Sequence, residues 1–217
     1  MKDKMFRALF IISLAVLILT FSIGLPIYFR PFYYLQIEGL GIPEDTGMSK
    51  EEIKEGYDEV LDYLTLPGKE FGTGKFSYSE DGKAHFADCK RLFNLNAIGF
   101  TVSLIVVILL SVLHRLGKIK LKERGKLPPS FFSGVGLVSV FALLGGIVSL
   151  DFDRAFEVFH AIFFPGKDNW LFNPFEDGII LAMPERFFMR CALLIASSII
   201  LISVFLIVRG VKSKRSK

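Results

Sequence analysis

The sequence has few of the residue types that often indicate an enzyme, with 3 histidines, 2 cysteines and 1 tryptophan among 217 residues. The two cysteines, Cys89 and Cys191, are too few for a disulfide framework. The chain also lacks the glycine-rich motifs of nucleotide-binding proteins and the Gly-x-Ser-x-Gly elbow of serine hydrolases. Nucleotide chemistry and serine hydrolysis are therefore disfavoured.

Charge is missing from four long stretches, which contain no Asp, Glu, Lys or Arg: 8–29, 97–113, 127–150 and 191–208. Hydrophobic residues make up 52% of the chain, which is more than soluble globular proteins usually hold. About 20 apolar residues suffice for a helix to cross a hydrocarbon core of roughly 30 Å. Only helices and closed barrels satisfy their own backbone groups in lipid. The stretches therefore predict four transmembrane helices.

The first stretch follows three basic residues and could be a secretory signal peptide. Its apolar run is longer than the about 7–15 residues of such a signal, which favours an uncleaved helix. The predicted fold is an all-α membrane protein that forms a single integral membrane domain over residues 1–217. Its spans are placed at about 8–29, 97–116, 130–150 and 190–208.

Positive charge gathers on one side of these spans. Segments 1–7, 114–126 and 209–217 hold 14 of the 26 Lys and Arg residues, but only Asp3 and Glu123 among the 22 acidic ones. The positive-inside rule then places both termini in the cytoplasm. Because topology accounts for these basic segments, no nucleic-acid partner is predicted.

The same rule makes the loop 117–129 cytoplasmic and the loops 30–96 and 151–189 extracellular. The two outer loops, taken as 30–96 and 151–190, are predicted to form a small extracellular α+β cap. A Ser-x-x-Glu capping box at Ser49 and Glu52 begins a helix.

Two further elements are predicted in the cap. The Asp81-Gly82 pair, between FSYS and AHF, is typical of a β-hairpin turn. In the second outer loop a phenylalanine stripe at helical spacing indicates a short interfacial helix, which Pro165-Gly166 ends.

Two of the three histidines, His85 and His160, lie in the outer loops, and each has a carboxylate three residues away, Asp88 and Glu157. A carboxylate partner can orient an imidazole and raise its basicity. Both histidines are close in sequence to an outer helix end, so neighbouring helices could bring them together. Two imidazoles with an ordinary pKa of about 6.5 suit proton transfer, one as acceptor and the other as donor.

Other interpretations of these residues stay open. His160 and Glu157 could simply belong to the exposed polar stripe of an amphipathic helix. His85 and His160, with Asp88 or Glu157, could bind zinc. Cys89 could act as a nucleophile. Transport is disfavoured, because the spans hold no ionisable group except His114 at the cytoplasmic end of the second.

Two segments resemble the signature regions of the bacterial lipoprotein intramolecular transacylases. They are SYSEDGKAHFADCKRLFN, with its H-x-x-D-x-K core, and FHAIFFPGKDNWLFNPFEDGIILAMPERFF. The four-helix layout is similar as well, so the resemblance covers nearly the whole chain. Cys89 departs from the family pattern, in which a small apolar residue is expected.

The resemblance implies an acyltransferase that uses no external acyl donor. From the residues themselves we expect metal-free acid–base catalysis, and no cofactor is predicted. The implied enzyme would move the sn-2 acyl chain of an S-diacylglyceryl-cysteine lipoprotein to the α-amino group of the same cysteine, which gives a lyso-form lipoprotein. The family's critical histidines correspond to His85 and His160. The implied partners are diacylated bacterial lipoproteins and membrane lipid, at the extracellular face of the bacterial cytoplasmic membrane.

Roles for the site residues follow from this reaction. An α-amino group with a pKa of about 7.7–8.0 is largely protonated at neutral pH, so a base must free its lone pair. We expect His160, oriented by Glu157, to be this base. We expect His85, oriented by Asp88, to stabilise the oxyanion or protonate the departing sn-2 oxygen, and the two roles could be exchanged.

Further side chains are expected to bind the substrate. Aromatic residues would line a groove for acyl chains and cations would meet lipid headgroups: Phe159, Phe163, Phe164, Trp170, Lys90 and Arg186. A non-enzymatic membrane binding or assembly protein and a metal-dependent lipid hydrolase remain the alternative functions.

Overall fold

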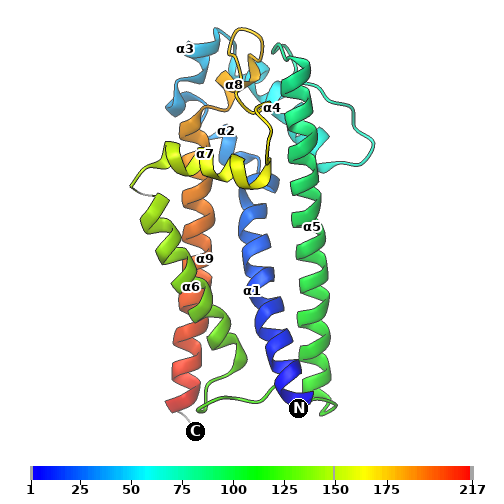
Figure 1. Ribbon diagram of the computed structural model, residues 1–217, viewed down its shortest axis with the longest axis vertical. Coiled ribbons are helices and arrows are strands. Elements are labelled where there is room, and N and C mark those ends of the chain that lie inside the picture. Colours follow the sequence, from blue (N-terminus) through cyan, green and yellow to red (C-terminus); the bar gives the residue numbers. More distant parts are fainter. Residues whose placement is uncertain (1, 149, 216–217) are drawn as a thin grey trace. The chain divides into compact units, whose positions relative to one another are not determined.

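The computed structural model describes residues 2–148 and 150–215. Met1, Ser149, Ser216 and Lys217, which belong to the predicted termini and third span, lie outside the described residues. Within those residues four helices are long and apolar enough to cross a membrane: α1 (Lys2–Tyr28), α5 (Glu80–Arg115), α6 (Pro129–Val148) and α9 (Glu185–Arg215) (Figure 1). The predicted set of four apolar helices is confirmed.

The chain divides into two compact units. Unit 1 comprises Met1–Leu25, Asn96–Leu150 and Leu194–Lys217, and unit 2 comprises Pro26–Leu95 and Asp151–Leu193. The charge-free stretches lie almost wholly in unit 1, whereas both outer-loop histidines belong to unit 2.

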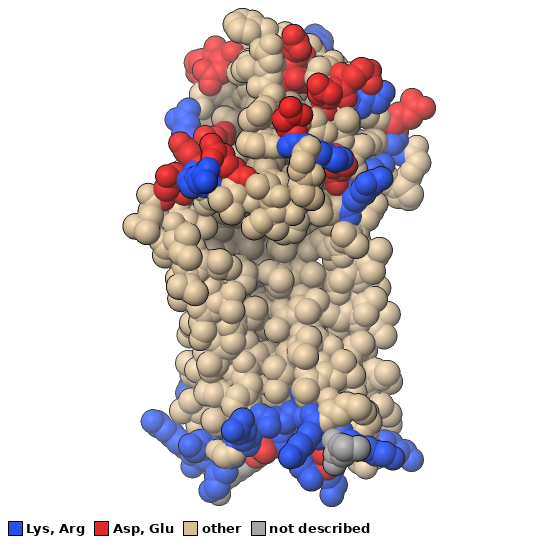
Figure 2. All heavy atoms as spheres, viewed as in Figure 1, with Lys and Arg blue, Asp and Glu red and all other residues tan. Residues whose placement is uncertain are grey.

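Unit 1 is built from apolar helices, and several of its polar side chains bond to backbone carbonyls. The Thr20 hydroxyl donates to the Val16 carbonyl oxygen at 2.8 Å, one turn earlier in α1. The Ser133 hydroxyl on α6 donates to the Ile11 carbonyl oxygen of α1 at 3.0 Å. Lysine and arginine side chains gather at the end of this unit where α1 begins and α9 ends (Figure 2).

Helix α5 is much longer than a membrane crossing requires. Its 36 residues extend over about 54 Å at 1.5 Å per residue, against a hydrocarbon core of roughly 30 Å. The charge-free run 97–113 is the part of α5 that is apolar enough to cross a membrane. The preceding residues, 80–95, carry charged side chains, lie outside that segment and contribute to unit 2.

Unit 2 consists of short helices between the long ones. They are α2 (Pro31–Tyr34), η1 (Glu38–Leu40), α3 (Ile42–Thr46), α4 (Lys50–Thr65), α7 (Phe152–Phe163) and α8 (Ile179–Ala182). The predicted capping box is present at the start of α4, where the Ser49 side chain accepts from the Glu52 amide and Glu52 bonds back to the Ser49 amide.

An aromatic core holds unit 2 together. The rings of Tyr33 and Tyr57 stack with centroids 3.7 Å apart, and the Tyr33 hydroxyl donates to the Ala182 carbonyl oxygen at 2.6 Å. Both rings are almost fully buried. The core therefore joins segments that are nearly 150 residues apart in the sequence.

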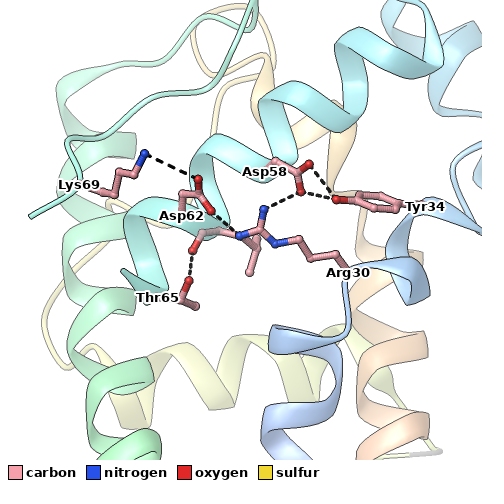
Figure 3. Close-up of polar contacts among 7 residues, drawn as sticks. Arg30, Tyr34, Asp58, Asp62, Thr65 and Lys69 are labelled. Atoms are coloured by element: carbon pink, nitrogen blue, oxygen red, sulfur yellow. Dashed lines mark hydrogen bonds and ion pairs between the residues drawn. The ribbon is translucent and has the colours of Figure 1, made fainter. Parts of the chain in front are cut away.

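A polar cluster fastens α2 and the residue before it to α4 (Figure 3). The Arg30 guanidinium pairs with Asp58 at 3.0 Å and also with Asp62. The Tyr34 hydroxyl donates to Asp58 at 2.5 Å, and the Lys69 ammonium lies 4.0 Å from Asp62. These side chains are about one-third exposed or more, so their role is to orient the segments rather than to form the core.

The predicted hairpin, and with it the β part of the cap, is wrong. No β-strand occurs in residues 2–148 or 150–215, and Asp81 and Gly82 lie in the first turn of α5. The Ser79 hydroxyl accepts a hydrogen bond from the Gly82 amide at 2.9 Å, in the manner of a helix N-cap. An Asp-Gly pair after serine suits this start equally well, since an acidic side chain is favourable in a first helical turn.

The predicted helix in the second outer loop is present as α7. The Asp151 side chain accepts from the Arg154 amide at 2.9 Å, and the helix ends just before Pro165 and Gly166. Its polar stripe is only partly exposed, however. Glu157 faces solvent, whereas His160 is buried. The interpretation of His160 as part of an exposed polar stripe is therefore wrong.

Candidate active site

His85 of α5 and His160 of α7 lie side by side within unit 2. Their ring centroids are 5.8 Å apart and their planes differ by 32°. Both residues are buried, with 6% and 5% of their surface exposed. Two residues separated by 75 positions in the sequence therefore share one small, water-poor site.

A buried carboxylate fixes the start of α5, six residues before His85. Asp177, which is 4% exposed, accepts hydrogen bonds from the Ser79 amide at 2.7 Å and from the Ser79 hydroxyl at 2.9 Å. Gly82 allows this approach, because a Cβ atom there would overlap the Asp177 carboxylate and lie 3.2 Å from the Phe172 ring. The loop before α8 is thus anchored to the helix that carries His85.

The His160 ring is held by a backbone carbonyl and by aromatic neighbours. Its Nδ1 lies 2.8 Å from the Phe156 carbonyl oxygen, and since a carbonyl only accepts, Nδ1 carries the proton. The Trp170 indole stacks on the imidazole at 4.3 Å, and the Phe156 ring lies at the same centroid distance. The neutral ring therefore keeps its lone pair on Nε2, which makes no hydrogen bond with the described part of the chain.

The His85 ring is enclosed by aromatic rings and a thiol. The centroids of Phe164 and Phe172 lie 4.9 and 5.5 Å from it, both in edge-on contact. The Cys89 sulfur, one helical turn away, lies 3.3 Å from Nε2. Nδ1 is fully buried and has no hydrogen-bond partner that meets ordinary geometry in residues 2–148 and 150–215.

Burial keeps both imidazoles neutral. Burial, together with the neighbouring His160, lowers the pKa of His85 to about 4. Burial also lowers the pKa of His160, against the opposing effect of the bond to the Phe156 carbonyl. At neutral pH the site thus offers two uncharged imidazoles, each able to accept a proton.

The family model of lipoprotein intramolecular transacylase Lit matches residues 8–188 of the chain. The chain belongs to this family. As a family member it is an acyltransferase and a multi-pass membrane protein, as the sequence resemblance implied.

Solved structures of the membrane integral transacylase Lit from Bacillus cereus have the same fold. One is 24% identical, covers 100% of this chain and 99% of its own, and superposes with a TM-score of 0.88. A variant with histidine replaced by arginine covers 99% and 94% with a TM-score of 0.79, and one with histidine replaced by alanine covers 100% and 96% with 0.80, both at 24% identity. No curated protein sequence matches the chain.

The carboxylates expected to orient the histidines of this Lit family member have other partners. Asp88 accepts from the Lys167 ammonium at 2.5 Å and from the Asn169 side-chain amide at 3.4 Å. Glu157 pairs with Arg154 at 2.7 Å on the exposed side of α7. Neither carboxylate bonds directly to an imidazole, and His160 takes its orientation from the Phe156 carbonyl instead.

The expected substrate-binding aromatics are divided between the site and the surface. Phe164 is buried against both imidazoles, and Trp170 covers the face of His160. Phe159 and Phe163 are nearly half exposed, with ring centroids 4.6 Å apart. The structure thus brings Phe164 and Trp170 to the histidines. The half-exposed Phe159 ring also meets His160 edge-on, with centroids 5.4 Å apart, and Phe163 packs against Phe159.

The expected headgroup-binding cations are engaged within unit 2. The Lys90 ammonium lies over the Tyr63 ring, 4.1 Å from its centroid. The Arg186 guanidinium donates to the Leu40 carbonyl oxygen at 3.2 Å. Both side chains thus help to join α5 and α9 to the short helices of the unit.

The zinc and thiol alternatives fit the geometry poorly. In the described ranges no three His, Cys, Asp or Glu side chains are arranged so that they could hold a metal ion. Burial raises the pKa of the Cys89 thiol to about 12, so at neutral pH the sulfur is protonated and a weak nucleophile.

Sequence reasoning missed several side chains that build the site. Asp177 anchors α5, Phe156 and Phe172 enclose the imidazoles, and Lys167 and Asn169 surround Asp88. All but Phe156 lie in the second signature segment. The dense clustering of polar and aromatic residues in KDNWLFNPFED was the signal that could have identified them.

Proposed function

We propose that the chain moves the sn-2 acyl chain of a diacylated lipoprotein to the α-amino group of that lipoprotein's N-terminal cysteine. His85 and His160 would perform the acid–base chemistry, without a cofactor or a bound metal. The observation that carries this proposal is the pair of buried, neutral imidazoles 5.8 Å apart in a member of a lipoprotein transacylase family. The related Bacillus cereus protein is itself described as a lipoprotein intramolecular transacylase, and two of its structures have a histidine replaced.

The proton balance of the reaction calls for two acceptors. The substrate amine begins as an ammonium group and ends as an amide N–H, so it loses two protons. One proton is transferred to the departing sn-2 oxygen, which becomes a hydroxyl group, and the other passes to solvent. No acyl donor besides the substrate is consumed, because the ester bond breaks as the amide bond forms.

His160 suits removal of the first proton. Its Nδ1–H is bonded to the Phe156 carbonyl, so Nε2 has a free lone pair directed away from the helix backbone. Accepting the ammonium proton there leaves a neutral amine that can attack the ester carbonyl carbon. The bond to Phe156 steadies the resulting imidazolium, since the carbonyl still accepts from Nδ1.

His85 suits transfer of the second proton. It would take the proton from the nitrogen that has attacked and give it to the sn-2 oxygen as the C–O bond breaks. Its pKa of about 4 makes the transient imidazolium a strong donor to a departing alkoxide. Phe164 and Phe172 exclude water from this exchange, which favours transfer to the amine over hydrolysis.

Intramolecular delivery supplies much of the remaining rate enhancement. The amine and the ester belong to one molecule, so binding need only hold them in the reactive geometry. Effective concentrations of about 10⁵ M or more are typical of well-oriented intramolecular reactions. Phe159 and Phe163, exposed on α7, are proposed to contact the acyl chains in this complex.

We propose further that the whole chain is one integral membrane domain with the site on the extracellular side of the bacterial cytoplasmic membrane. The support is the gathering of Lys and Arg at one end of unit 1, which the positive-inside rule assigns to the cytoplasm (Figure 2). Single cysteines at Lys120 and Asp168, in a chain without Cys89 and Cys191, would test it. An impermeant maleimide applied to intact cells should label position 168 and not position 120.

The reaction is tested with a synthetic S-diacylglyceryl-cysteine lipopeptide that carries a deuterated sn-2 chain. Tandem mass spectrometry should show an unchanged total mass, with the label moved to the cysteine nitrogen. His85→Gln and His160→Gln should each abolish the transfer. His114→Gln is the matched control, since His114 lies exposed at the other end of α5, and it should leave the rate unchanged.

The other outcomes contradict the proposal in different ways. An unmodified lipopeptide that nevertheless binds would favour a non-enzymatic binding protein. Release of the deuterated chain as a free fatty acid, sensitive to chelators, would favour a metal-dependent lipid hydrolase. Transfer that survives both histidine substitutions would leave the reaction intact but remove the proposed acid–base pair.

A further inference from the structure

The segment 167–170, between α7 and α8, contacts His160 and the part of α5 that carries His85. The Trp170 indole stacks on His160 with planes 22° apart, and its Nε1 donates to the Lys167 carbonyl oxygen at 3.1 Å. The Lys167 ammonium bonds to Asp88 at 2.5 Å, one turn beyond His85 on α5. The segment is therefore tied to the helix of one histidine while it covers the ring of the other.

Asn169 lies at the centre of this segment with a fixed amide orientation. A carboxylate such as Asp88 only accepts hydrogen bonds, so the contact at 3.4 Å must come from the Asn169 Nδ2 amino group. The Lys167 ammonium and, at 4.0 Å, the Arg91 guanidinium keep Asp88 ionised by lowering its pKa. The Asn169 Oδ1 atom consequently points away from Asp88.

Two buried polar atoms of this region are then left without a hydrogen-bond partner within the described part of the chain. Asn169 Oδ1 and His85 Nδ1 are both fully buried, and in the described residues neither has a partner of ordinary hydrogen-bond geometry. The Asn169 side chain also interacts with His85 in the direction that raises the pKa of the imidazole. An amide oxygen can only accept, so the two atoms are complementary only when Nδ1 carries a proton.

We propose that Asn169 is a positioning residue that holds His85 in the Nδ1–H tautomer, with Lys167 and Asp88 fixing the orientation of its side-chain amide. This tautomer puts the lone pair of His85 on Nε2, the nitrogen that the Cys89 sulfur approaches to 3.3 Å. The opposite tautomer would direct the Nδ1 lone pair at the Asn169 oxygen, and the two would repel each other. The inference builds on the proposed function, because it names the residue that prepares His85 for proton transfer.

The tautomer can be read directly by nitrogen NMR of the full chain in detergent micelles with ¹⁵N-labelled histidine. The three histidines give three pairs of ring-nitrogen signals, and His114→Gln and His160→Gln assign them. In the wild-type protein His85 should carry its proton on Nδ1. In Asn169→Ala it should become a mixture of tautomers, whereas Asp168→Ala, an exposed neighbour in the same segment, should leave it unchanged.

Measurements of kcat and of the His85 titration distinguish a positioning role of Asn169 from a purely structural one. Asn169→Ala should lower kcat for the lipopeptide at least about tenfold, by analogy with the loss of a partner that orients a metal-bound histidine, with less effect on KM. Asn169→Asp places a carboxylate beside Nδ1–H and should raise the midpoint of the His85 NMR titration by about 1 unit or more. The charged or titratable neighbours Asp88, Lys167, Cys89 and His160 are unchanged in Asn169→Ala and Asn169→Asp.

Two results would overturn the inference. The first is a wild-type His85 with its proton on Nε2, a result that does not depend on the folding of any Asn169 variant. The second is an Asn169→Ala protein whose tautomer and kcat match those of Asp168→Ala. If the wild-type chain transfers no acyl group, the proposed function fails, but the tautomer and the Asn169→Asp titration still decide the role of Asn169.

Discussion

Acid should destabilise this protein chiefly through one buried histidine. His85 is 6% exposed, and burial lowers its pKa from 6.5 to about 4. Below pH 6.5 the unfolded chain therefore binds a proton that the folded chain does not, and the free energy of unfolding falls. The loss begins near pH 6.5 and is complete below about pH 4, where the folded protein is protonated as well.

The size of this effect follows from the two pKa values. At pH 5 the difference in proton binding amounts to about 2 kcal/mol, taking about 1.36 kcal/mol for each pH unit. For a domain of this size 1 kcal/mol shifts Tm by about 2–4 °C, so His85 alone should lower Tm by about 4–8 °C between pH 7.5 and pH 5. His160 should add to the fall, because its pKa is lowered too.

Thermal unfolding of the detergent-solubilised protein, followed by circular dichroism, is a suitable assay. Carboxylates whose pKa is lowered by ion pairs, such as Glu52 and Asp88, also cost stability in acid, so the wild type by itself does not isolate the histidine. His85→Gln keeps a polar side chain that cannot be charged. The difference in Tm between pH 7.5 and pH 5 should shrink by several degrees in this variant, and by much less in His114→Gln. Equal acid sensitivity of the wild type and His85→Gln would refute the assignment of a neutral, buried His85.

Three further predictions concern the anchor of α5, the thiol and the pH range of the reaction. Gly82→Ala should lower the free energy of unfolding by about 1–3 kcal/mol, because the new methyl group displaces the buried Asp177 side chain. Chemical denaturation would measure this loss. A stability equal to that of the wild type would show that the Asp177 side chain can move freely. Cys89→Ala should keep more than about one-third of the lipopeptide transfer rate, since a thiol with a pKa of about 12 is not a nucleophile at pH 7. Inactivation of a folded variant would restore the alternative in which Cys89 is the nucleophile. The fall of kcat at low pH should begin below pH 6.5, because both imidazoles must be neutral to accept protons and both have a lowered pKa. Rate measurements with the lipopeptide over a range of pH would test this. A fall of kcat that begins above pH 6.5 and depends on the enzyme would contradict the site geometry.

The anchor and the histidine pair are connected through the same helix. Asp177 holds the first turn of α5, and His85 follows within the next two turns. Displacing Asp177 should therefore disturb the distance between the imidazoles as well as the stability. In Gly82→Ala the acyl transfer rate should therefore fall by a larger factor than the fraction of folded protein does. That difference would show that the anchor and the histidine pair are connected.

The local features of the fold could be read from the sequence because their causes lie within a few neighbouring residues. A run of about 20 apolar residues must become a helix in lipid whatever surrounds it. The capping box at Ser49 and Glu52 is closed by two residues that are three positions apart, and α4 begins there as predicted. The two signature segments likewise indicate the family by themselves, because each is a continuous run of residues.

The same local reasoning failed where two outcomes share one signal. An Asp-Gly pair is favourable in a hairpin turn and in the first turn of a helix. The helix start is favoured over the hairpin turn by Asp177, which lies 98 residues from Ser79 in the sequence and accepts hydrogen bonds from its amide and hydroxyl. No window around Asp81 contains that information.

The partners of the histidines were likewise decided by tertiary structure. Spacing along a helix suggested Asp88 for His85 and Glu157 for His160, since residues three apart lie on one face. In the folded protein Asp88 instead bonds to Lys167 and Asn169, about 80 residues away. Glu157 is exposed to solvent and pairs with Arg154. The sequence thus determined which residue types and which helices are present, because these depend on hydropathy and nearby hydrogen bonds. Only the fold determined which buried atoms meet, because a buried polar group takes whichever partner the packing of distant segments brings within reach.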